Sequence, residues 1–373
     1  MRVLVAMPLA TSLGGGELML RQLLRHGRHE GVTWRVVYLR DGPMVEETRA
    51  LGIEVDVIDA GRFREIFKRV RAVRRIASLA EEWSADLILG WMVAGQLTAG
   101  PAGVFARIPV VWYQVGTPRP DWLDRVATAL PARGILVLSK AGAAAQARVW
   151  PRRPQALVYP GASLDAFDPS KLPAPSAMRV RLGLPSRGPL VGIVARLQRW
   201  KGVHVFIDAV AQAMQRHPDL TAVIVGGAHE TERGYGEELA ARARQIGVDS
   251  RIHFAGFQPN IPEWMQAMDV VVHASDREPF GIVVIEAMAL GKPVIAGSAG
   301  GPAEIITDGT DGLLSPFGDA PALGRAISRL IDDPALAKRL AAAATARAAE
   351  FDDHRYAQHV ISSLRSFRND TLR

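Results

Sequence analysis

Two acidic residues, Glu278 and Glu286, lie eight residues apart in a stretch whose local pattern is suited to binding a ligand. Glu278 falls in a predicted loop beside a proline, and Glu286 falls on an apolar helix predicted to begin at about Gly281. The N-terminus of a helix attracts phosphate, because its first N–H groups are unpaired and the helix dipole is positive there. A carboxylate one or two turns further along can accept hydrogen bonds from sugar hydroxyls. The stretch therefore predicts a socket for a molecule that carries both phosphates and hydroxyls.

Two cationic residues follow a predicted buried strand at 190–194. Arg196 comes just after this strand, and Lys201 comes five residues later, at the start of the next predicted helix. Arginine can hold a diphosphate through its planar fork and lysine as a point charge. A lone arginine or lysine is usually only solvated, but the carboxyl ends of the strands are where α/β sheets bind their ligands. This placement favours a diphosphate contact for both residues.

Glycine turns follow two other predicted strands. The run Gly14-Gly15-Gly16 comes after the first strand and opens the first predicted helix. A dinucleotide fingerprint would need a further glycine where Met19 stands, so a dehydrogenase is excluded. The run is either a tight turn or a place where the backbone approaches phosphate or substrate. A second turn, Gly300-Gly301, is either of the same kind or a plain turn before a helix led by Pro302.

Short β-branched runs alternate with longer helical patterns along the whole chain, which indicates parallel sheets with crossover helices. The fold class is therefore α/β, with two doubly wound domains. The best boundary is the segment 167–176, where three prolines fall within seven residues and neither a helix nor a central strand can continue. The predicted strands are 3–7, 34–38, 87–89, 109–112, 134–138, 156–159, 190–194, 221–225, 251–254, 270–273 and 293–296.

The composition narrows the class of protein. The chain has 373 residues and no cysteine, which excludes disulfides, thiolate metal sites and cysteine nucleophiles. Neither an Asp-x-Asp pair nor a histidine pair at i, i+4 occurs, so no metal site is predicted. No apolar run approaches the ~20 residues that span a bilayer, and we expect a cytoplasmic protein. The net charge of +7 suits anionic substrates or an anionic membrane surface better than nucleic acid, for which no motif is present.

The segment 62–76 is the strongest charge feature, with seven basic residues and one acidic residue. Apolar residues at 63, 66, 67, 70 and 73 fall on one helical stripe. One interpretation is a surface helix that packs this stripe on its sheet. The other is contact with an anionic membrane, to which each basic residue would contribute ~1 kcal/mol. The candidate membrane contacts are Lys68, Arg69, Arg71 and Arg74.

The order and spacing of these motifs carry a family resemblance. Arg196-x4-Lys201, Glu278-x7-Glu286 and the first glycine run are accompanied by Tyr159-Pro160-Gly161, Val225-Gly226-Gly227, Gly256 and Gly300-Gly301-Pro302-Ala303-Glu304. Nearly end to end, the chain resembles the retaining, GT-B-fold glycosyltransferases of family 4. The resemblance implies two Rossmann-like domains with a cleft between them. These are an N-terminal acceptor-side domain at 1–168 with a returning helix at 355–373, a linker at 169–187, and a C-terminal nucleotide-sugar-binding domain at 188–354.

The resemblance also assigns roles by position. It implies that Arg196 and Lys201 bind the diphosphate of a nucleotide sugar and, with Glu278, form the catalytic set. Glu286 would accept hydrogen bonds from the ribose, and Phe257 would lie near the base. Glu278 would hold the donor sugar together with backbone from the start of the helix. The full donor-binding set is Gly15, Gly16, Arg196, Lys201, Phe257, Glu278, Pro279, Phe280, Gly281, Ile282 and Glu286.

The implied reaction is transfer of a sugar, with retained configuration, to a sugar, lipid-linked or small-molecule acceptor, in cell-envelope glycan or glycolipid synthesis. No metal or cofactor is expected, since the nucleotide sugar is a co-substrate. Many relatives carry a histidine where this chain has Gln114 and Val115, which become the acceptor-side candidates. The alternatives are a sugar phosphorylase, a nucleotide-sugar epimerase, or a catalytically silent partner subunit that binds a nucleotide sugar.

Overall fold

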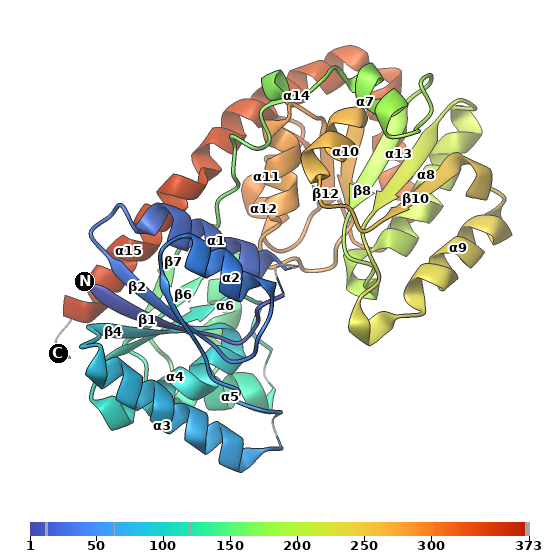
Figure 1. The fold of residues 1–373 in the computed structure, drawn as a ribbon. Coiled ribbons are helices and arrows are strands. Elements are labelled where there is room, and N and C mark those ends of the chain that lie inside the picture. Colours follow the sequence, from blue (N-terminus) through green and yellow to red (C-terminus); the bar gives the residue numbers. More distant parts are fainter. Residues whose placement is uncertain (12–13, 63, 120, 370–373) are drawn as a thin grey trace. The chain divides into compact units, whose positions relative to one another are not determined.

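The computed structural model describes residues 1–11, 14–62, 64–119 and 121–369 (Figure 1). The chain forms two compact units, Met1–Gly161 with Asp353–Arg373, and Ala162–Asp352. The proline-rich segment 167–176, where the sequence predicts the boundary, therefore lies inside the second unit. Each unit is an α/β sheet whose described strand pairs are all parallel, as the alternation of strands and helices predicts.

The sheet of the first unit has seven strands in the order β3-β2-β1-β4-β5-β6-β7. The order reverses between β1 and β4, whose carboxyl ends therefore flank the crevice where such sheets bind ligands. The inner strands are buried along nearly their whole length, as expected for a sheet covered by helices on both faces. The strands are β1 (Arg2–Met7), β2 (Thr33–Tyr38), β3 (Glu54–Val57), β4 (Leu87–Trp91), β5 (Val110–Gln114), β6 (Gly134–Val137) and β7 (Gln155–Leu157).

Six helices of the first unit connect its strands, and the last helix of the chain completes it. The connecting helices are α1 (Gly15–Gly27), α2 (Pro43–Ala50), α3 (Ile66–Glu82), α4 (Met92–Ala106), α5 (Trp122–Ala129) and α6 (Lys140–Gln146). Helix α15 (Asp353–Asn369) packs on α1, where Asp353 pairs with His26 at 3.2 Å. The ring of Phe367 fills the space that a Cβ of Gly134 would need, so this helix is fitted closely to β6.

The sheet of the second unit has six strands in the order β10-β9-β8-β11-β12-β13, with its reversal between β8 and β11. A large apolar core lies between this sheet and helices such as α8 and α13. The strands are β8 (Leu190–Val194), β9 (Thr221–Val225), β10 (Ile252–Gly256), β11 (Val270–His273), β12 (Val294–Gly297) and β13 (Leu313–Ser315). The α-helices are α7 (Pro175–Arg181), α8 (Val203–Arg216), α9 (Tyr235–Ile246), α10 (Ile261–Ala267), α11 (Ile282–Ala289), α12 (Pro302–Ile305), α13 (Ala320–Asp332) and α14 (Pro334–Ala348).

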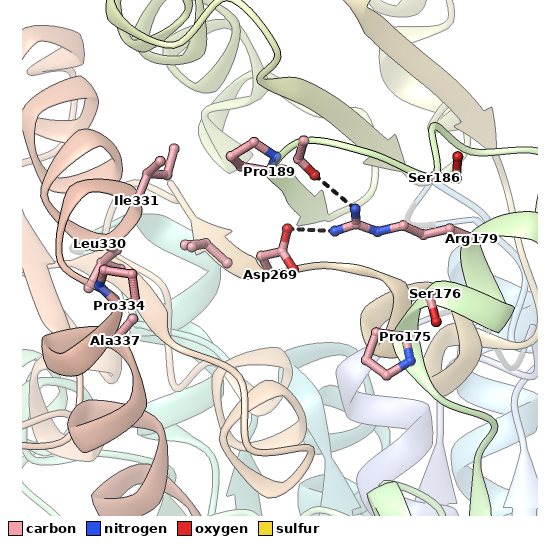
Figure 2. Close-up of a pocket in the computed structure, with 12 residues that line it drawn as sticks. Pro175, Ser176, Arg179, Ser186, Pro189, Asp269, Leu330, Ile331, Pro334 and Ala337 are labelled. Carbon is pink, nitrogen blue, oxygen red and sulfur yellow. Dashed lines mark hydrogen bonds and ion pairs between the residues drawn. The ribbon is translucent and has the colours of Figure 1, made fainter.

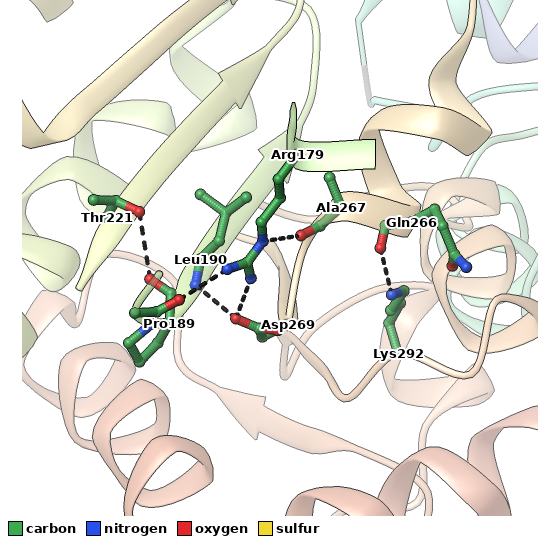
Figure 3. Close-up of polar contacts among 9 residues, drawn as sticks. Arg179, Pro189, Leu190, Thr221, Gln266, Ala267, Asp269 and Lys292 are labelled. Carbon is green, nitrogen blue, oxygen red and sulfur yellow. Dashed lines mark hydrogen bonds and ion pairs between the residues drawn. The ribbon is translucent and has the colours of Figure 1, made fainter. Parts of the chain in front are cut away.

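The segment predicted as a linker, 169–187, contains α7, which is fixed to the start of the sheet by Arg179. This buried guanidinium donates to the carbonyls of Ala267 and Gly188 at 2.9 Å each and pairs with Asp269 at 2.5 Å (Figure 3). Asp269 also accepts from the backbone N–H of Leu190 at 2.8 Å. Burial lowers the pKa of the neighbouring Lys292 to about 8, and its ammonium donates to the carbonyl of Gln266 (Figure 3).

A cavity of about 630 Å³ lies beside Arg179 and Asp269 (Figure 2). Apolar residues such as Leu330, Ile331 and Pro334 line its other side. It opens at the amino ends of β8 and β11, the edge opposite to the one at which doubly wound sheets bind ligands. Its arginine and aspartate are already paired with each other and with backbone. We therefore regard it as a gap beside a structural ion pair rather than as the functional site.

One interpretation of the sequence predicts that the apolar stripe at 63, 66, 67, 70 and 73 packs on the sheet. In the structure most of this stripe on helix α3 is exposed. Of that stripe, Val73 is buried, whereas Ile66, Phe67 and Val70 are exposed to 67%, 92% and 43%; Phe63 lies outside the described residues. The buried face consists of Ala72, Val73, Ile76, Ala77, Leu79 and Ala80. The first turns of α3 therefore present apolar side chains to solvent, along a stripe whose continuation from Val73 onward is buried.

Candidate active site

The carboxyl ends of β8 and β11 bring the two predicted cations of the second unit to one edge of the sheet. Arg196 follows β8 and is exposed, and its guanidinium has no ion pair with any residue that the structure describes. Lys201 ends a 3₁₀ turn, Arg199–Lys201, and its side chain is only 15% exposed. The next residue, Gly202, has φ +70, and a Cβ there would lie 2.0 Å from the carbonyl oxygen of Ala274. This close approach places Lys201 against the loop that follows β11.

Lys201 and Glu278 form a partly buried ion pair, with 2.6 Å between Nζ and Oε2. His273, the last residue of β11, places its Nε2 3.2 Å from the same carboxylate oxygen. Burial opposes ionisation of Glu278, but the Lys201 charge and the hydrogen bond from His273 outweigh it and hold the pKa of Glu278 well below its usual range. The protein thus keeps this carboxylate ionised and oriented.

The loop that carries Glu278 is shaped by backbone contacts. Arg277 adopts the left-handed conformation at φ +44, which is costly for a non-glycine residue and is often found at functional sites. The Glu278 carbonyl accepts from the N–H of Gly301 at 2.9 Å, and a Cβ at Gly300 would lie 2.4 Å from that carbonyl oxygen. The second glycine turn therefore supports the Glu278 loop. Phe280 is 2% exposed and packs on Phe351, so only its backbone is available to a ligand.

Helix α11 begins as the sequence predicts and presents an uncapped N-terminus. Its N-cap, Gly281, has φ +105, and no side chain of the described residues caps the helix. Glu286 lies on this helix and is 8% exposed. No hydrogen bond or ion pair joins its carboxylate to any group that the structure describes, and burial raises the pKa of Glu286 to about 7. A buried acid without a protein partner is suited to accept hydrogen bonds from a ligand.

Phe257 lies at the same edge of the second sheet, after β10. Its side chain is 62% exposed. Gly227, after β9, leaves room for it, since a Cβ there would lie 3.0 Å from the Cβ of Phe257. An exposed aromatic ring at a ligand-binding edge offers a stacking surface for a planar base.

In the first unit, the glycine run meets residues from two other strand ends. A Cβ at Gly16 would lie 2.1 Å from Cε of Met92 and 3.0 Å from Cγ1 of Val115. The indole of Trp91 donates to the Gly16 carbonyl at 3.1 Å and fixes the turn. A Cβ at Gly15 would meet no atom of the described residues within 4 Å. Gly16 is therefore required by packing, whereas no described residue crowds Gly15; Ser12 and Leu13, earlier in the same loop, lie outside the described residues.

Gln114 ends β5 and is 3% exposed. Its amide nitrogen donates to Oδ1 of Asp124 at 2.9 Å, and Oδ2 of Asp124 accepts from the N–H of Arg119 at 2.8 Å. Burial raises the pKa of Asp124, although these two hydrogen bonds oppose the shift. The amide nitrogen of Gln114 is thus used inside the protein, which leaves its oxygen as the group that could face a hydroxyl.

Comparison with known proteins gives the family and the fold of the chain. A sequence model described as "Glycosyl transferases group 1" matches residues 176–347. A crystal structure of the Anabaena protein HepE in complex with UDP and glucose is 30% identical, with a TM-score of 0.88, and covers 98% of this chain and 100% of that one. This chain belongs to the glycosyltransferase group 1 family, and its fold is GT-B. A glycosyltransferase from Rickettsia africae, 18% identical over 99% of each chain with a TM-score of 0.89, supports the fold alone.

Among curated members of the group 1 family, a D-inositol 3-phosphate glycosyltransferase from Corynebacterium urealyticum is 33% identical over 217 residues, which are 57% of this chain and 51% of that protein. One from Frankia alni is 34% identical over 56% of this chain and 52% of that protein. The chain thus spans about half the length of the curated relatives it matches.

For this glycosyltransferase group 1 protein, the structure brings Lys201 and Glu278 into contact and places Arg196, Phe257 and Glu286 at the same sheet edge. Their roles toward a ligand stay predictions. Two polar partners, His273 and Asp124, were missed by the sequence analysis. A histidine at the end of a buried strand, five residues before Glu278, was a signal for the first. Among the described residues, no three histidine, aspartate or glutamate side chains lie close enough to hold a metal ion.

Proposed function

We propose that the chain transfers a sugar from a nucleotide-diphosphate sugar to a hydroxyl-bearing acceptor. The observation that carries this proposal is the edge of the second sheet, where the Lys201–Glu278 pair occurs together with Arg196 and a helix N-terminus, both without a side-chain partner among the described residues. This combination suits a ligand with a diphosphate and hydroxyls. The crystal structures of HepE with UDP and glucose and with UDP-glucose support a nucleotide sugar as the donor.

Each residue has a chemical role in the proposed reaction. The leaving diphosphate gains negative charge as the glycosidic bond breaks, and Arg196, Lys201 and the N–H groups at the start of α11 would stabilise it. Such preorganised charge is usually the largest contribution to catalysis. Glu278 would hold a hydroxyl of the donor sugar and Glu286 the ribose. The backbone of Pro279, Phe280, Gly281 and Ile282 would line the sugar, Phe257 the base, and Gly15 and Gly16 stay candidates for phosphate contact.

We further propose retention of configuration, by attack from the face that the diphosphate leaves, with the diphosphate taking the acceptor proton. The positive charge of Arg196 and Lys201 makes a metal ion unnecessary in this scheme. Product analysis distinguishes the alternatives: an epimerase converts the nucleotide sugar without an acceptor, and a phosphorylase requires free phosphate. A silent binding subunit would bind the donor and release no nucleotide. The acceptor would be a sugar, a lipid-linked glycan or a small polyol.

The first experiment is a thermal-shift screen of UDP-, GDP- and ADP-sugars, followed by assay of nucleotide release with the stabilising donor. We expect one base to stabilise the protein clearly, and release that increases when acceptor sugars or polyols are supplied. No stabilisation by any of these donors would contradict the proposal. Stabilisation without release or transfer, with all acceptors tested, would instead support the silent subunit.

We propose that the protein works at an anionic membrane surface, through the first turns of α3. None of the helices in the described part of the chain combines the length and apolar character needed to span a bilayer. Phe67, Val70, Arg71 and Arg74 fall on one helical face, at positions i, i+3, i+4 and i+7. Arg71 and Arg74 are exposed and form no ion pair with the described residues. Apolar side chains flanked by free cations complement an interface of acyl chains and anionic headgroups.

The other two candidate contacts differ. Lys68 pairs with Asp59 at 3.3 Å and with Glu65 at 2.8 Å, and Arg69 is half-buried. The contribution of α3 to membrane binding should therefore come chiefly from Phe67, Arg71 and Arg74.

Sedimentation with phosphatidylserine vesicles tests this surface. The double variant Arg71→Ser/Arg74→Ser should bind about 10-fold or more weakly at low salt, since each basic residue contributes ~1 kcal/mol, and Phe67→Ser should also weaken binding. Arg75→Ser is the matched control, because Arg75 is already engaged by an acid, Glu82, at 3.4 Å. No binding of the wild-type protein at low salt, or equal losses in the control, would reject this surface.

A further inference from the structure

His273 is a buried polar side chain at the candidate site to which the proposed reaction gives no role. It is 5% exposed, and its Nε2 lies 3.2 Å from Oε2 of Glu278 and 3.2 Å from Oγ of Ser275. Its Nδ1 is buried and has no hydrogen-bond partner among the described residues. The ring therefore makes all of its polar contacts through one nitrogen, and that nitrogen faces the Glu278 carboxylate.

The protonation state of the ring follows from its neighbours. An ionised carboxylate only accepts hydrogen bonds, so the nitrogen beside it must carry the proton. A proton on Nδ1 would bury an N–H without an acceptor, which native proteins rarely tolerate. The titratable group in contact with the ring is Glu278, which Lys201 contacts in turn, and Ser275 is the neutral neighbour of the ring. The ring therefore carries a proton on Nε2, and its hydrogen bond is directed at Glu278.

Lys201 and His273 both contact Oε2 of Glu278, at 2.6 Å and 3.2 Å. No hydrogen bond from the described residues reaches Oε1, which leaves that oxygen available for a sugar hydroxyl. The two partners differ in what they can do next. Lys201 has three donors on a flexible stem and can turn toward an incoming diphosphate. His273 is fixed at the end of a buried strand and cannot.

We propose that His273 is a positioning residue that holds Oε2 of Glu278 when Lys201 engages the donor diphosphate, so that Oε1 stays directed at the donor sugar. The inference rests on the proposed function, since it assumes a donor with both groups. Without His273, a diphosphate that draws Lys201 away would leave a buried carboxylate unpaired, which is costly. With His273 in place, Lys201 can contact the donor diphosphate while Oε2 of Glu278 keeps a hydrogen-bond donor.

The first test uses the ligand-free protein and does not depend on the donor. Two-bond ¹H–¹⁵N spectra of the histidine rings, with His273→Gln used for assignment, should show a proton on Nε2 of His273. In Glu278→Gln the same ring should shift its ¹⁵N resonances or become a mixture of tautomers. An Nδ1–H tautomer in the wild-type protein would overturn the proposal.

The second test separates positioning from packing. His273→Leu removes the donor, whereas the amide nitrogen of His273→Gln can take the place of Nε2. With UDP-glucose as the probe, His273→Leu should lower kcat/KM about 10- to 100-fold, the usual range for a hydrogen bond to a charged group, and His273→Gln should restore most of it. The affinity for UDP alone should stay unchanged in both variants, and the acid limb of the pH profile should move to higher pH only in His273→Leu.

The outcomes separate this inference from the proposed function. The exposed His359→Asn is the control and should match the wild-type protein throughout. Equal losses in the leucine and glutamine variants, or parallel losses of UDP affinity, would mean that His273 only fills space. If the wild-type protein does not use UDP-glucose, the nucleotide sugar found in the thermal-shift screen replaces it. If none serves, the proposed function fails, while the tautomer measurement still decides whether His273 holds Glu278.

Discussion

Glu278 and Glu286 are two buried acids at one sheet edge, and their surroundings drive them in opposite directions. Around Glu278, an ammonium and an imidazole N–H outweigh burial, and the pKa of the carboxyl lies well below its usual range. Around Glu286 none of the described groups offsets burial, and the pKa rises to about 7. The first acid is thus paired by the protein itself. The second has no partner among the residues that the structure describes and remains destabilising until a ligand supplies one.

The difference indicates that Glu278 and Glu286 have separate roles at the site. A carboxylate that orients a reacting sugar must be ionised and fixed before the donor arrives, because preorganisation is what lowers the barrier. A carboxylate that only binds a ribose can stay unsatisfied in the free protein and gain its hydrogen bonds on binding. Such a group lowers the stability of the free protein in exchange for ligand affinity, the usual trade-off at functional sites.

The largest expected effect comes from removing the cation that Glu278 shares with the diphosphate. Lys201→Ala should lower turnover by about 100- to 1,000-fold, as does loss of one preorganised donor to a developing negative charge. The matched control is Arg199→Ala, which removes a cation from the same 3₁₀ turn that is engaged by Glu238 and Tyr235. Initial rates and circular dichroism measure both variants. Turnover near the wild-type value in Lys201→Ala would refute the diphosphate assignment.

The next effect tests whether Glu278 stabilises the free protein. Its folded pKa is lowered, so its contribution is present above the pKa of the unfolded chain and is lost as pH falls through the folded pKa. Glu278→Gln should therefore reduce the free energy of unfolding at pH 7 by about 3 kcal/mol, as when one partner of a buried pair is removed. Urea denaturation at pH 7 checks this. An unchanged midpoint would mean that the pair with Lys201 contributes nothing.

Glu286→Gln should have the opposite effect and increase the free energy of unfolding. Its folded pKa is about 7, against an ordinary value of 4.5 for a glutamate carboxyl. Below pH 4.5 both the folded and unfolded states hold the proton, and as pH rises toward 7 only the unfolded state loses it, so the wild-type protein loses stability. At pH 8 the glutamine variant should be more stable by roughly 2–3 kcal/mol, and near pH 4.5 by about zero. Denaturation curves at the two pH values decide; the same offset at both would exclude titration of Glu286 as the cause.

Most of the second unit could be predicted from sequence, because its inner strands are continuous β-branched runs and Arg196 and Glu278 lie shortly after two of them.

Two edge strands, one in each sheet, were not predicted. β3 reads Glu-Val-Asp-Val and β13 has three residues, so neither shows the apolar run that marks a buried strand. The exposure of the apolar residues in the first turns of α3 could not be predicted either. Periodicity shows that they share a stripe, but it does not show whether the sheet extends far enough to cover them.

Two side-chain contacts, of His273 with Glu278 and of Gln114 with Asp124, could not be predicted from the sequence for a different reason. Each joins residues whose meeting depends on rotamers and on the path of a loop, such as the left-handed turn at Arg277. Spacing along the chain shows which residues reach one edge of a sheet. It does not show which of them touch.

The smallest expected effect is on ligand affinity, and it distinguishes the role of Glu286 from that of Glu278. Glu286→Ala should weaken UDP binding about 10-fold by calorimetry, because the ribose would lose its hydrogen bonds to a charged acceptor, worth about 1.5 kcal/mol. Glu278→Gln should bind UDP like the wild-type protein, since UDP carries no donor sugar, and should weaken only UDP-glucose. Equal losses of UDP affinity in the two variants would show that both acids serve the nucleotide, and the division between them would be wrong.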